Sequence, residues 1–206
     1  MAKRVLDILV CVIAAPFALP LMLLCALAVR LTSPGPVLFR QVRVGKNRQT
    51  FEMLKFRTMY VNAPDLRNAD GSTFNQDSDP RVTSAGRFLR KTSLDELPQL
   101  INVLRGNMSI VGPRPDLPDH LSYYRPRDFE RLTVRPGLTG LPQVRGRNSL
   151  SWEQRRDLDI EYVKTWSVWM DIKIMVLTVP TVLFGRGIYV QNAQPKAEST
   201  STGRES

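Results

Sequence analysis

Histidine and cysteine are scarce in this chain of 206 residues, which has one histidine, His120, and two cysteines, Cys11 and Cys25. Zinc sites and nucleophiles activated by histidine need more of these side chains than the chain supplies. Both cysteines lie in one apolar run near the N-terminus, so we expect them to pack as small hydrophobic residues rather than to form a disulfide or a redox pair. A bound metal would then be a hard cation on oxygen ligands, with magnesium first.

Acidic residues are outnumbered, with 19 Asp and Glu against 29 Lys and Arg and a net charge of +10. This excess favours an anionic partner, which can be nucleic acid, acidic lipid headgroups or a phosphorylated substrate. The basic loops hold almost no aromatic residues for base stacking, and no signature of a nucleic-acid-binding fold is found, so no nucleic-acid partner is expected. The length suits one domain with a substantial core.

An uncharged run of 22 residues extends from Ile8 to Val29, and as a helix it would reach roughly 33 Å, about one hydrocarbon thickness. A plain transmembrane span and a cleaved signal peptide are two interpretations, although the run is longer than the apolar part of most signal peptides. The third is a re-entrant helix that returns to the same membrane face. Pro16 and Pro20 would bend such a helix, and cations flank both ends of the run.

The soluble part is predicted to be a helix-rich α+β single domain with a small β-hairpin. The hairpin is indicated by residues 37–44 and 51–59, which partly alternate apolar and polar residues around a Gly45-Lys46-Asn47 turn. Residues 62–79 are rich in Asn, Asp, Ser and Gly and are expected to form a surface loop. The polar tail from Gln194 onward is expected to be disordered.

Helices are predicted over residues 84–105 and from Ser151 to about Lys164. In the first, Pro98 would either kink the helix or lie in the first turn of one that begins near Ser93. The second begins with a capping box between Ser151 and Gln154. The apolar segment after it is broken by Pro180 and is too short to span a membrane. Its tryptophans are typical of an interfacial membrane helix or, equally, of a buried one.

An adjacent acidic pair, Asp95 and Glu96, follows the cations Arg90 and Lys91. Carboxylates among cations suggest a reacting acid and a bound anion. A structural interpretation competes with this one, because Ser93 and Glu96 have the spacing of a capping box at a helix N-terminus. The pair alone does not decide between them.

Two loops rich in glycine and proline follow the acidic pair. Gly112-Pro113-Arg114-Pro115 holds an arginine between prolines, which restrict the backbone around a bidentate phosphate donor. Residues 135–148 combine three arginines with three glycines, and glycine allows the backbone to approach a ligand closely. Ordinary turns with solvated arginines are the alternative for either loop.

The order of these motifs resembles that of the bacterial sugar transferases, the monotopic polyprenyl-phosphate phosphoglycosyl transferases. The matching segments are residues 3–7, 55–59, 79–83, 86–100, 102–106, 109–115, 135–140 and 146–148. The match extends over roughly residues 3–190, and the length is similar to that of the small members that consist of the catalytic domain alone. Family members often have Ser-Pro at the membrane kink, whereas here Leu19 precedes Pro20.

The resemblance implies transfer of a phosphosugar from a UDP-sugar to polyprenyl (undecaprenyl) phosphate with release of UMP, the first membrane step of a bacterial glycan assembly pathway. It implies Mg²⁺ (or Mn²⁺) and a covalent intermediate on Asp95, which would also bind the metal, with Glu96 assisting as a base or orienter. It further implies a re-entrant helix at residues 1–33 in the inner membrane, with a catalytic domain at 34–190 facing the cytoplasm and a tail at 191–206. A homodimer and downstream glycosyltransferases are further expected partners, besides membrane lipids.

Candidate substrate contacts come from the basic motifs. Lys55, Arg90 and Arg114 are expected to clamp phosphates, and residues 135–147 to form the nucleotide side. The full set is Lys55, Arg57, Arg90, Pro113, Arg114, Pro115, Arg135, Gly137, Thr139, Gly140, Gln143, Arg145 and Arg147. The opposing hypotheses are a membrane-anchored binding protein without catalysis and a cleaved periplasmic protein.

Overall fold

The computed structural model describes residues 2–66, 74, 79–146 and 149–183. The elements are α1 (Ala2–Thr32), β1 (Leu38–Val44), η1 (Lys46–Arg48), β2 (Thr50–Phe56), α2 (Ser84–Thr92), η2 (Leu94–Glu96), α3 (Gln99–Arg105), β3 (Ser109–Val111), η3 (Pro118–Tyr123), η4 (Pro126–Thr133), β4 (Gly137–Thr139), α4 (Leu141–Arg145), α5 (Trp152–Thr165) and α6 (Val168–Leu183). Helices dominate this arrangement, which is compatible with the predicted α+β class. Most of the predicted 62–79 loop and the whole 191–206 tail lie outside the described residues.

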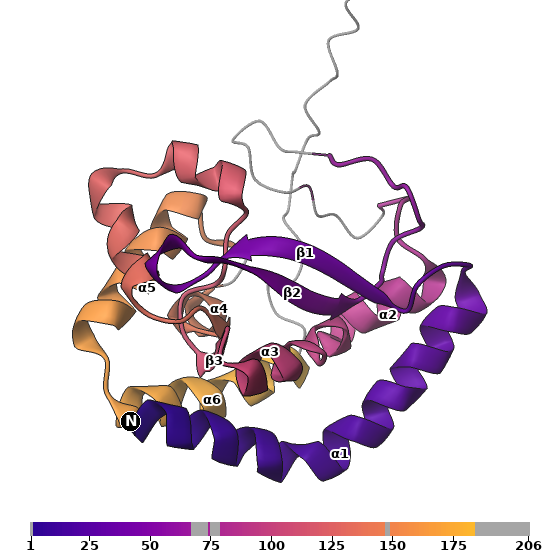
Figure 1. Cartoon of the computed structure of the whole chain (residues 1–206), viewed down its shortest axis with the longest axis horizontal. Coiled ribbons are helices and arrows are strands. Elements are labelled where there is room, and N and C mark those ends of the chain that lie inside the picture. Colours follow the sequence, from indigo (N-terminus) through magenta and orange to yellow (C-terminus); the bar gives the residue numbers. More distant parts are fainter. Residues whose placement is uncertain (1, 67–73, 75–78, 147–148, 184–206) are drawn as a thin grey trace, which may run out of the picture.

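The N-terminal helix α1 runs through Pro16 and Pro20 without interruption and is long and apolar enough to cross a membrane. In Figure 1 it curves along one side of the molecule, with its first turns beside α6 and its last turns near α2. Its middle is largely bare, and the Phe17 side chain is 79% exposed. A soluble protein would bury such a face, so this surface needs an apolar environment.

Both ends of α1 are fixed to the rest of the molecule. Near the N-terminus, the Asp7 carboxylate accepts hydrogen bonds from the Ser109 hydroxyl (2.8 Å) and the Ile110 amide (2.9 Å). Near the C-terminus, Cys25 and Val29 are buried in an apolar cluster with residues of β2 and α2. As predicted, the two cysteines are buried and unpaired.

The predicted hairpin is confirmed: β1 and β2 pair antiparallel, from Leu38 opposite Phe56 to Val44 opposite Thr50. The hairpin lies over α3, and Figure 1 shows β2 crossing above that helix. Met53 of β2 packs there into a core cluster with residues of α1, α3, β3, α5 and α6. This contact brings β2 next to the helical segment that carries the acidic pair.

Residues 84–105 do not form one unbroken helix. α2 ends at Thr92, Ser93 adopts a left-handed conformation (φ 57°), and the 3-10 helix η2 begins at Leu94. This is close to the predicted alternative of a helix that begins near Ser93, but Pro98 lies at the boundary between η2 and α3 rather than within a first turn. Among the described residues Ser93 gives η2 no side-chain cap, so the competing capping-box interpretation of Glu96 is not supported.

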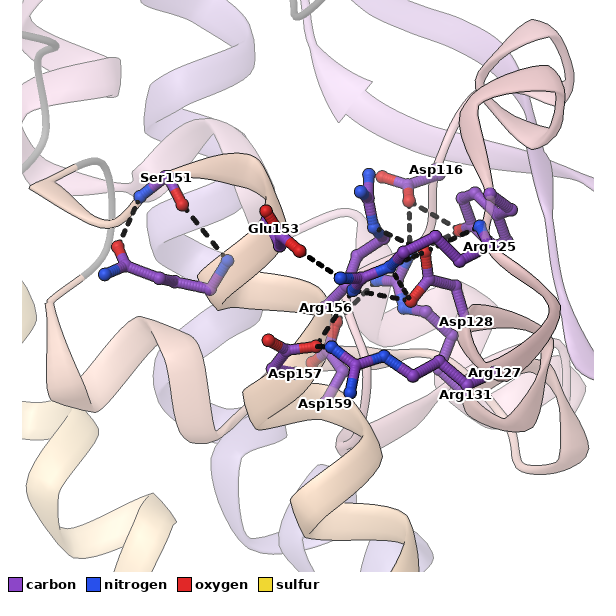
Figure 2. Close-up of polar contacts among 12 residues, drawn as sticks. Asp116, Arg125, Arg127, Asp128, Arg131, Ser151, Glu153, Arg156, Asp157 and Asp159 are labelled. Carbon is purple, nitrogen blue, oxygen red and sulfur yellow. Dashed lines mark hydrogen bonds and ion pairs between the residues drawn. The ribbon is translucent and has the colours of Figure 1, made fainter.

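The second capping box is confirmed. The Gln154 amide donates to the Ser151 hydroxyl (3.1 Å), and the Ser151 amide donates to the Gln154 side chain (2.8 Å), as Figure 2 shows. This reciprocal pair starts α5 one residue later, as its spacing predicts. The break predicted at Pro180 is wrong, because α6 continues through it to Leu183.

Candidate active site

Three distant segments meet at the acidic pair. The carboxylate of Glu96, on η2, accepts hydrogen bonds from Lys55 Nζ of β2 (2.8 Å) and from Arg114 Nη2 of the loop after β3 (2.5 Å). Lys55 Nζ also lies 4.0 Å from Asp95 Oδ2. The left-handed turn at Ser93 redirects the chain after α2, so both acids are presented at this meeting point rather than along a regular helix.

The two carboxyl groups differ in their pKa values although they are neighbours in sequence. Burial raises the pKa of Asp95 to about 6, against the opposing charge of Lys55 and with a further increase from the charge of Glu96. Burial acts on Glu96 too, but Arg114 and Lys55 together hold its pKa well below the usual range. The cations therefore favour the charged form of Glu96, whereas burial favours the protonated form of Asp95.

A third cation completes the surroundings of Asp95. Arg90, in the last turn of α2, donates from Nε to the Thr58 hydroxyl (2.9 Å), and its charge lowers the pKa of Asp95. Lys55, Arg90 and Arg114 were predicted together as phosphate clamps, and the structure brings all three to the acidic pair. Cations gathered around a buried carboxylate suit a site where anionic phosphate and a carboxylate must coexist.

Arg57 does not join this group. Its guanidinium is buried and donates to the Pro36 carbonyl (2.6 Å), the Ser33 hydroxyl (2.8 Å) and the Ser33 carbonyl (2.9 Å). These bonds fix the turn that connects α1 to β1. The structure therefore places this candidate substrate contact in the support of α1.

A buried polar network that the sequence analysis missed supports the backbone of Arg114. Arg131 donates to the Arg114 carbonyl (2.7 Å) and to the Asp159 carboxylate (2.5 Å), and it also bonds Asp116. Figure 2 shows this network between η4 and α5, together with the ion pairs of Arg125. These three partners of Arg131 lie 15 to 28 positions from it in the sequence, so no local spacing marks them. The network holds the backbone from which Arg114 reaches Glu96.

The glycines of the two basic loops serve close packing of the chain. β3 and β4 pair in parallel, and the Gly137 amide donates to the Pro113 carbonyl (2.8 Å). A Cβ atom on Gly137 would lie 2.1 Å from the Gly112 nitrogen, and one on Gly140 would lie 2.4 Å from the Gly112 carbonyl oxygen. Backbone thus approaches backbone where the sequence analysis expected backbone to approach a ligand.

The remaining candidates lie around this strand pair. Arg135 Nε donates to the Gly106 carbonyl (2.8 Å), and Arg145 is paired with Glu161 (3.0 Å). The Thr139 hydroxyl bonds that of Thr178 (2.8 Å), and the Pro115 carbonyl accepts from Arg43 (3.3 Å). Among the described residues, the buried Oε1 atom of Gln143 has no hydrogen-bond partner. Arg147 lies outside the described residues.

A family profile for the bacterial sugar transferases matches residues 1–185 of this sequence. The chain belongs to that family. The UDP-glucose:undecaprenyl-phosphate glucose-1-phosphate transferase of Caulobacter vibrioides is 49% identical over 191 residues, which cover 88% of the chain and 69% of that relative. The exopolysaccharide production protein ExoY of Rhizobium meliloti is 42% identical over 200 residues, covering 92% and 88%.

A third relative is the Escherichia coli (strain K12) UDP-glucose:undecaprenyl-phosphate glucose-1-phosphate transferase, 45% identical over 185 residues that cover 86% of the chain and 39% of the relative. The chain thus spans well under half of some relatives and most of others. As the resemblance implied, this bacterial sugar transferase is an enzyme of the phosphoglycosyl transferase type.

The site of this sugar transferase offers few protein ligands to a metal. Among the described residues, no group of three or more His, Cys, Asp or Glu side chains is placed to hold an ion. Lys55 and Arg114 both contact the same oxygen of Glu96, Oε1, and Asp95 Oδ2 lies 4.0 Å from Lys55 Nζ. Mg²⁺ at nucleotide sites is typically held by one or two carboxylates together with substrate phosphates and water. The acidic pair is compatible with that mode, in which Asp95 would be the protein ligand.

Proposed function

We propose that this sugar transferase moves a sugar phosphate from a UDP-sugar to undecaprenyl phosphate and releases UMP. The names of its relatives in Caulobacter and Escherichia coli support the reaction class and the lipid acceptor. The observation that carries the proposal is the Asp95–Glu96 pair among Lys55, Arg90 and Arg114. Positioned cations and a carboxylate of adjusted pKa are what phosphoryl transfer requires of a protein.

In the proposed reaction, an Asp95 oxygen attacks the sugar-bearing phosphorus of the UDP-sugar. The bond from that phosphorus to the bridging oxygen breaks, and UMP leaves with the electron pair. A phosphate oxygen of the polyprenyl acceptor then attacks the same phosphorus, which frees the Asp95 carboxylate and gives the diphosphate-linked sugar. Lys55, Arg90 and Arg114 offset the negative charge of the phosphates, and Glu96 orients two of these cations.

The proposed cofactor is Mg²⁺, with Mn²⁺ as a substitute, held by Asp95 and the phosphates of the substrate. When bound, such an ion neutralises charge on the diphosphate. Activity should then be lost in excess chelator and return when either metal is added back. Full turnover in excess chelator would exclude the metal.

For the membrane, the proposal is that α1 is re-entrant and enters from the cytoplasmic face of the inner membrane. Support comes from its two attached ends and its bare apolar middle, since a straight span would pull one end away from the domain. α6 is proposed to lie at the interface, because it exposes Trp169 (74%) and Val176 (64%).

The test is UMP release by the full chain with undecaprenyl phosphate and a panel of UDP-sugars. Wild type should release UMP with at least one donor, and Asp95→Asn should release none, since the amide keeps the size but removes the nucleophile. Asp119→Asn, at an exposed position of η3, is the matched control and should keep full activity. A membrane-anchored binding protein without catalysis would bind donors and release no UMP in any of the three proteins.

A further inference from the structure

The side chain of Asn102 takes the place of a neighbouring strand beside β2. Its Nδ2 atom donates to the Glu52 carbonyl (2.7 Å), and its Oδ1 atom accepts from the Leu54 amide (2.9 Å). These two groups flank Met53 on the edge of β2 that faces away from β1, where the described part of the chain provides no third strand. A residue on a parallel strand would bond the same two groups. Asn102 is 0% exposed, so both hydrogen bonds are shielded from water.

This contact joins the two parts of the chain that supply the active site, β2 with Lys55 and the segment of η2 and α3 with the acidic pair. Asn102 lies on α3, which follows η2 with its acidic pair, and β2 carries Lys55 one residue after Leu54. The Asn102 bonds join β2 to α3 at one point, and the Lys55–Glu96 bond joins β2 to η2 at another. These two connections fix the position of β2 relative to η2, and with it the distances from Lys55 Nζ to both carboxylates.

We propose that Asn102 is a positioning residue of the transferase, which holds β2 so that Lys55 stays in register with Asp95 and Glu96. This inference rests on the proposed function for its effect on the reaction. The geometry itself makes a separate claim, that loss of the Asn102 amide moves Lys55 Nζ away from the Glu96 carboxylate, to which it donates at 2.8 Å.

The experiment compares the full-length Asn102→Ala protein with Val103→Ala, a neighbour on the same helix that is equally buried but belongs to the apolar core. Three quantities are measured: thermal unfolding, the yield of the zero-length carbodiimide cross-link between Lys55 and Glu96, and kcat/KM for UMP release. Asn102→Ala should lower kcat/KM about tenfold, since misplacement of catalytic groups by about 1 Å can cost more than that. It should also lower the cross-link yield severalfold, because Lys55 no longer lies against Glu96, whereas Val103→Ala should lower thermal stability and leave that yield unchanged.

A double-mutant cycle with Lys55→Met separates positioning from general damage. If Asn102 acts through Lys55, kcat/KM of the double variant should match that of Lys55→Met alone. Asn102→Ser replaces Asn102→Ala if the latter does not fold. The inference is overturned if Asn102→Ala leaves the cross-link yield unchanged, if its loss of kcat/KM adds in full to that of Lys55→Met, or if neither Asn102 variant folds. A wild-type protein that releases no UMP would instead refute the proposed function, and the cross-link would still test Asn102.

Discussion

Asp95 and Glu96 are neighbouring carboxyl groups, but their surroundings shift their pKa values in opposite directions. Glu96 is held by two cations from elements 41 and 18 residues away. Asp95 is buried and lies at the outer limit of an ion pair with Lys55. A carboxylate with a raised pKa is a stronger base, and hence a better nucleophile, than an ordinary aspartate. The division of roles between the two acids follows from these contacts.

The pH dependence of kcat/KM should follow the ionisation of the Asp95 carboxyl. The reacting form is the carboxylate, and its fraction grows as pH rises through a pKa of about 6. We therefore expect kcat/KM for UMP release to fall tenfold per pH unit below about pH 6 and to level off above it. Steady-state rates between pH 4 and pH 8, at saturating metal, provide the measurement. An acid limb near pH 4, typical of a solvated aspartate, would contradict the burial argument.

Glu96→Gln should slow the reaction without preventing the covalent step. The amide cannot neutralise Lys55 and Arg114, so both cations lose a shared partner and their positions relax. Wild type mixed with donor but no lipid should release about one UMP per site in a burst, and Glu96→Gln should give a similar amplitude at a lower rate. Rapid-quench measurement of UMP tests both. No burst in wild type, or a complete loss of amplitude in Glu96→Gln, would overturn this division of roles.

Elements that form through local signals could be predicted from the sequence, and those that depend on distant partners could not. The hairpin and the start of α5 were predicted because alternation and the Ser151–Gln154 box act within a few residues. A new helix near Ser93 was one of two predicted alternatives, but the left-handed conformation of Ser93 was not predicted, because a non-glycine residue in that region is uncommon and distant contacts hold the acids beyond it. For the same reason the acidic pair was found as a motif, while Arg131 and Asn102 were not.

The β3–β4 pair makes its own prediction, at Gly137. A methyl group there would meet the Gly112 backbone nitrogen at 2.1 Å, which the strands can relieve only by separating. Gly137→Ala should therefore destabilise the protein by about 3 kcal/mol, and it should weaken activity because the loop carrying Arg114 follows β3. Gly106→Ala is the control. Its φ is +84°, but its Cβ would lie 3.8 Å from the nearest atom, Arg4 Nη2, so we expect a loss of stability of about 1 kcal/mol from the backbone conformation alone. Equal thermal unfolding of the two variants would refute the close approach.

On the scale of the whole molecule, α1 forms part of the catalytic domain as well as a membrane element. Its N-terminal turns bond α3, β3 and α6, and its C-terminal turns pack on β2 and α2. Its attachments therefore flank the elements that carry the acidic pair. On the membrane placement proposed for α1, an anchor built into the domain in this way would hold the acidic pair at a set height above the lipid surface.

Both ends of α1 should accordingly be reached from the same side of the membrane. In a background with Cys11→Ala and Cys25→Ala, single cysteines at Ala2 and Thr32 should react with an impermeant thiol reagent only from the cytoplasmic face. A cysteine at Ser122, on the exposed surface of η3, reports that face. Protection from opposite sides at the two positions would restore a plain transmembrane span.

The ion pair between Lys3 and Asp171 has a consequence for synthesis. These residues lie 168 positions apart and meet at 2.7 Å beside the Tyr162 hydroxyl. During translation α1 leaves the ribosome long before α6 exists, so its first turns have to wait for their partners while the apolar middle is already exposed. On the membrane placement proposed for α1, bilayer entry and domain folding would therefore overlap in time, and Lys3 would stay without its partner Asp171 until α6 is made and docks.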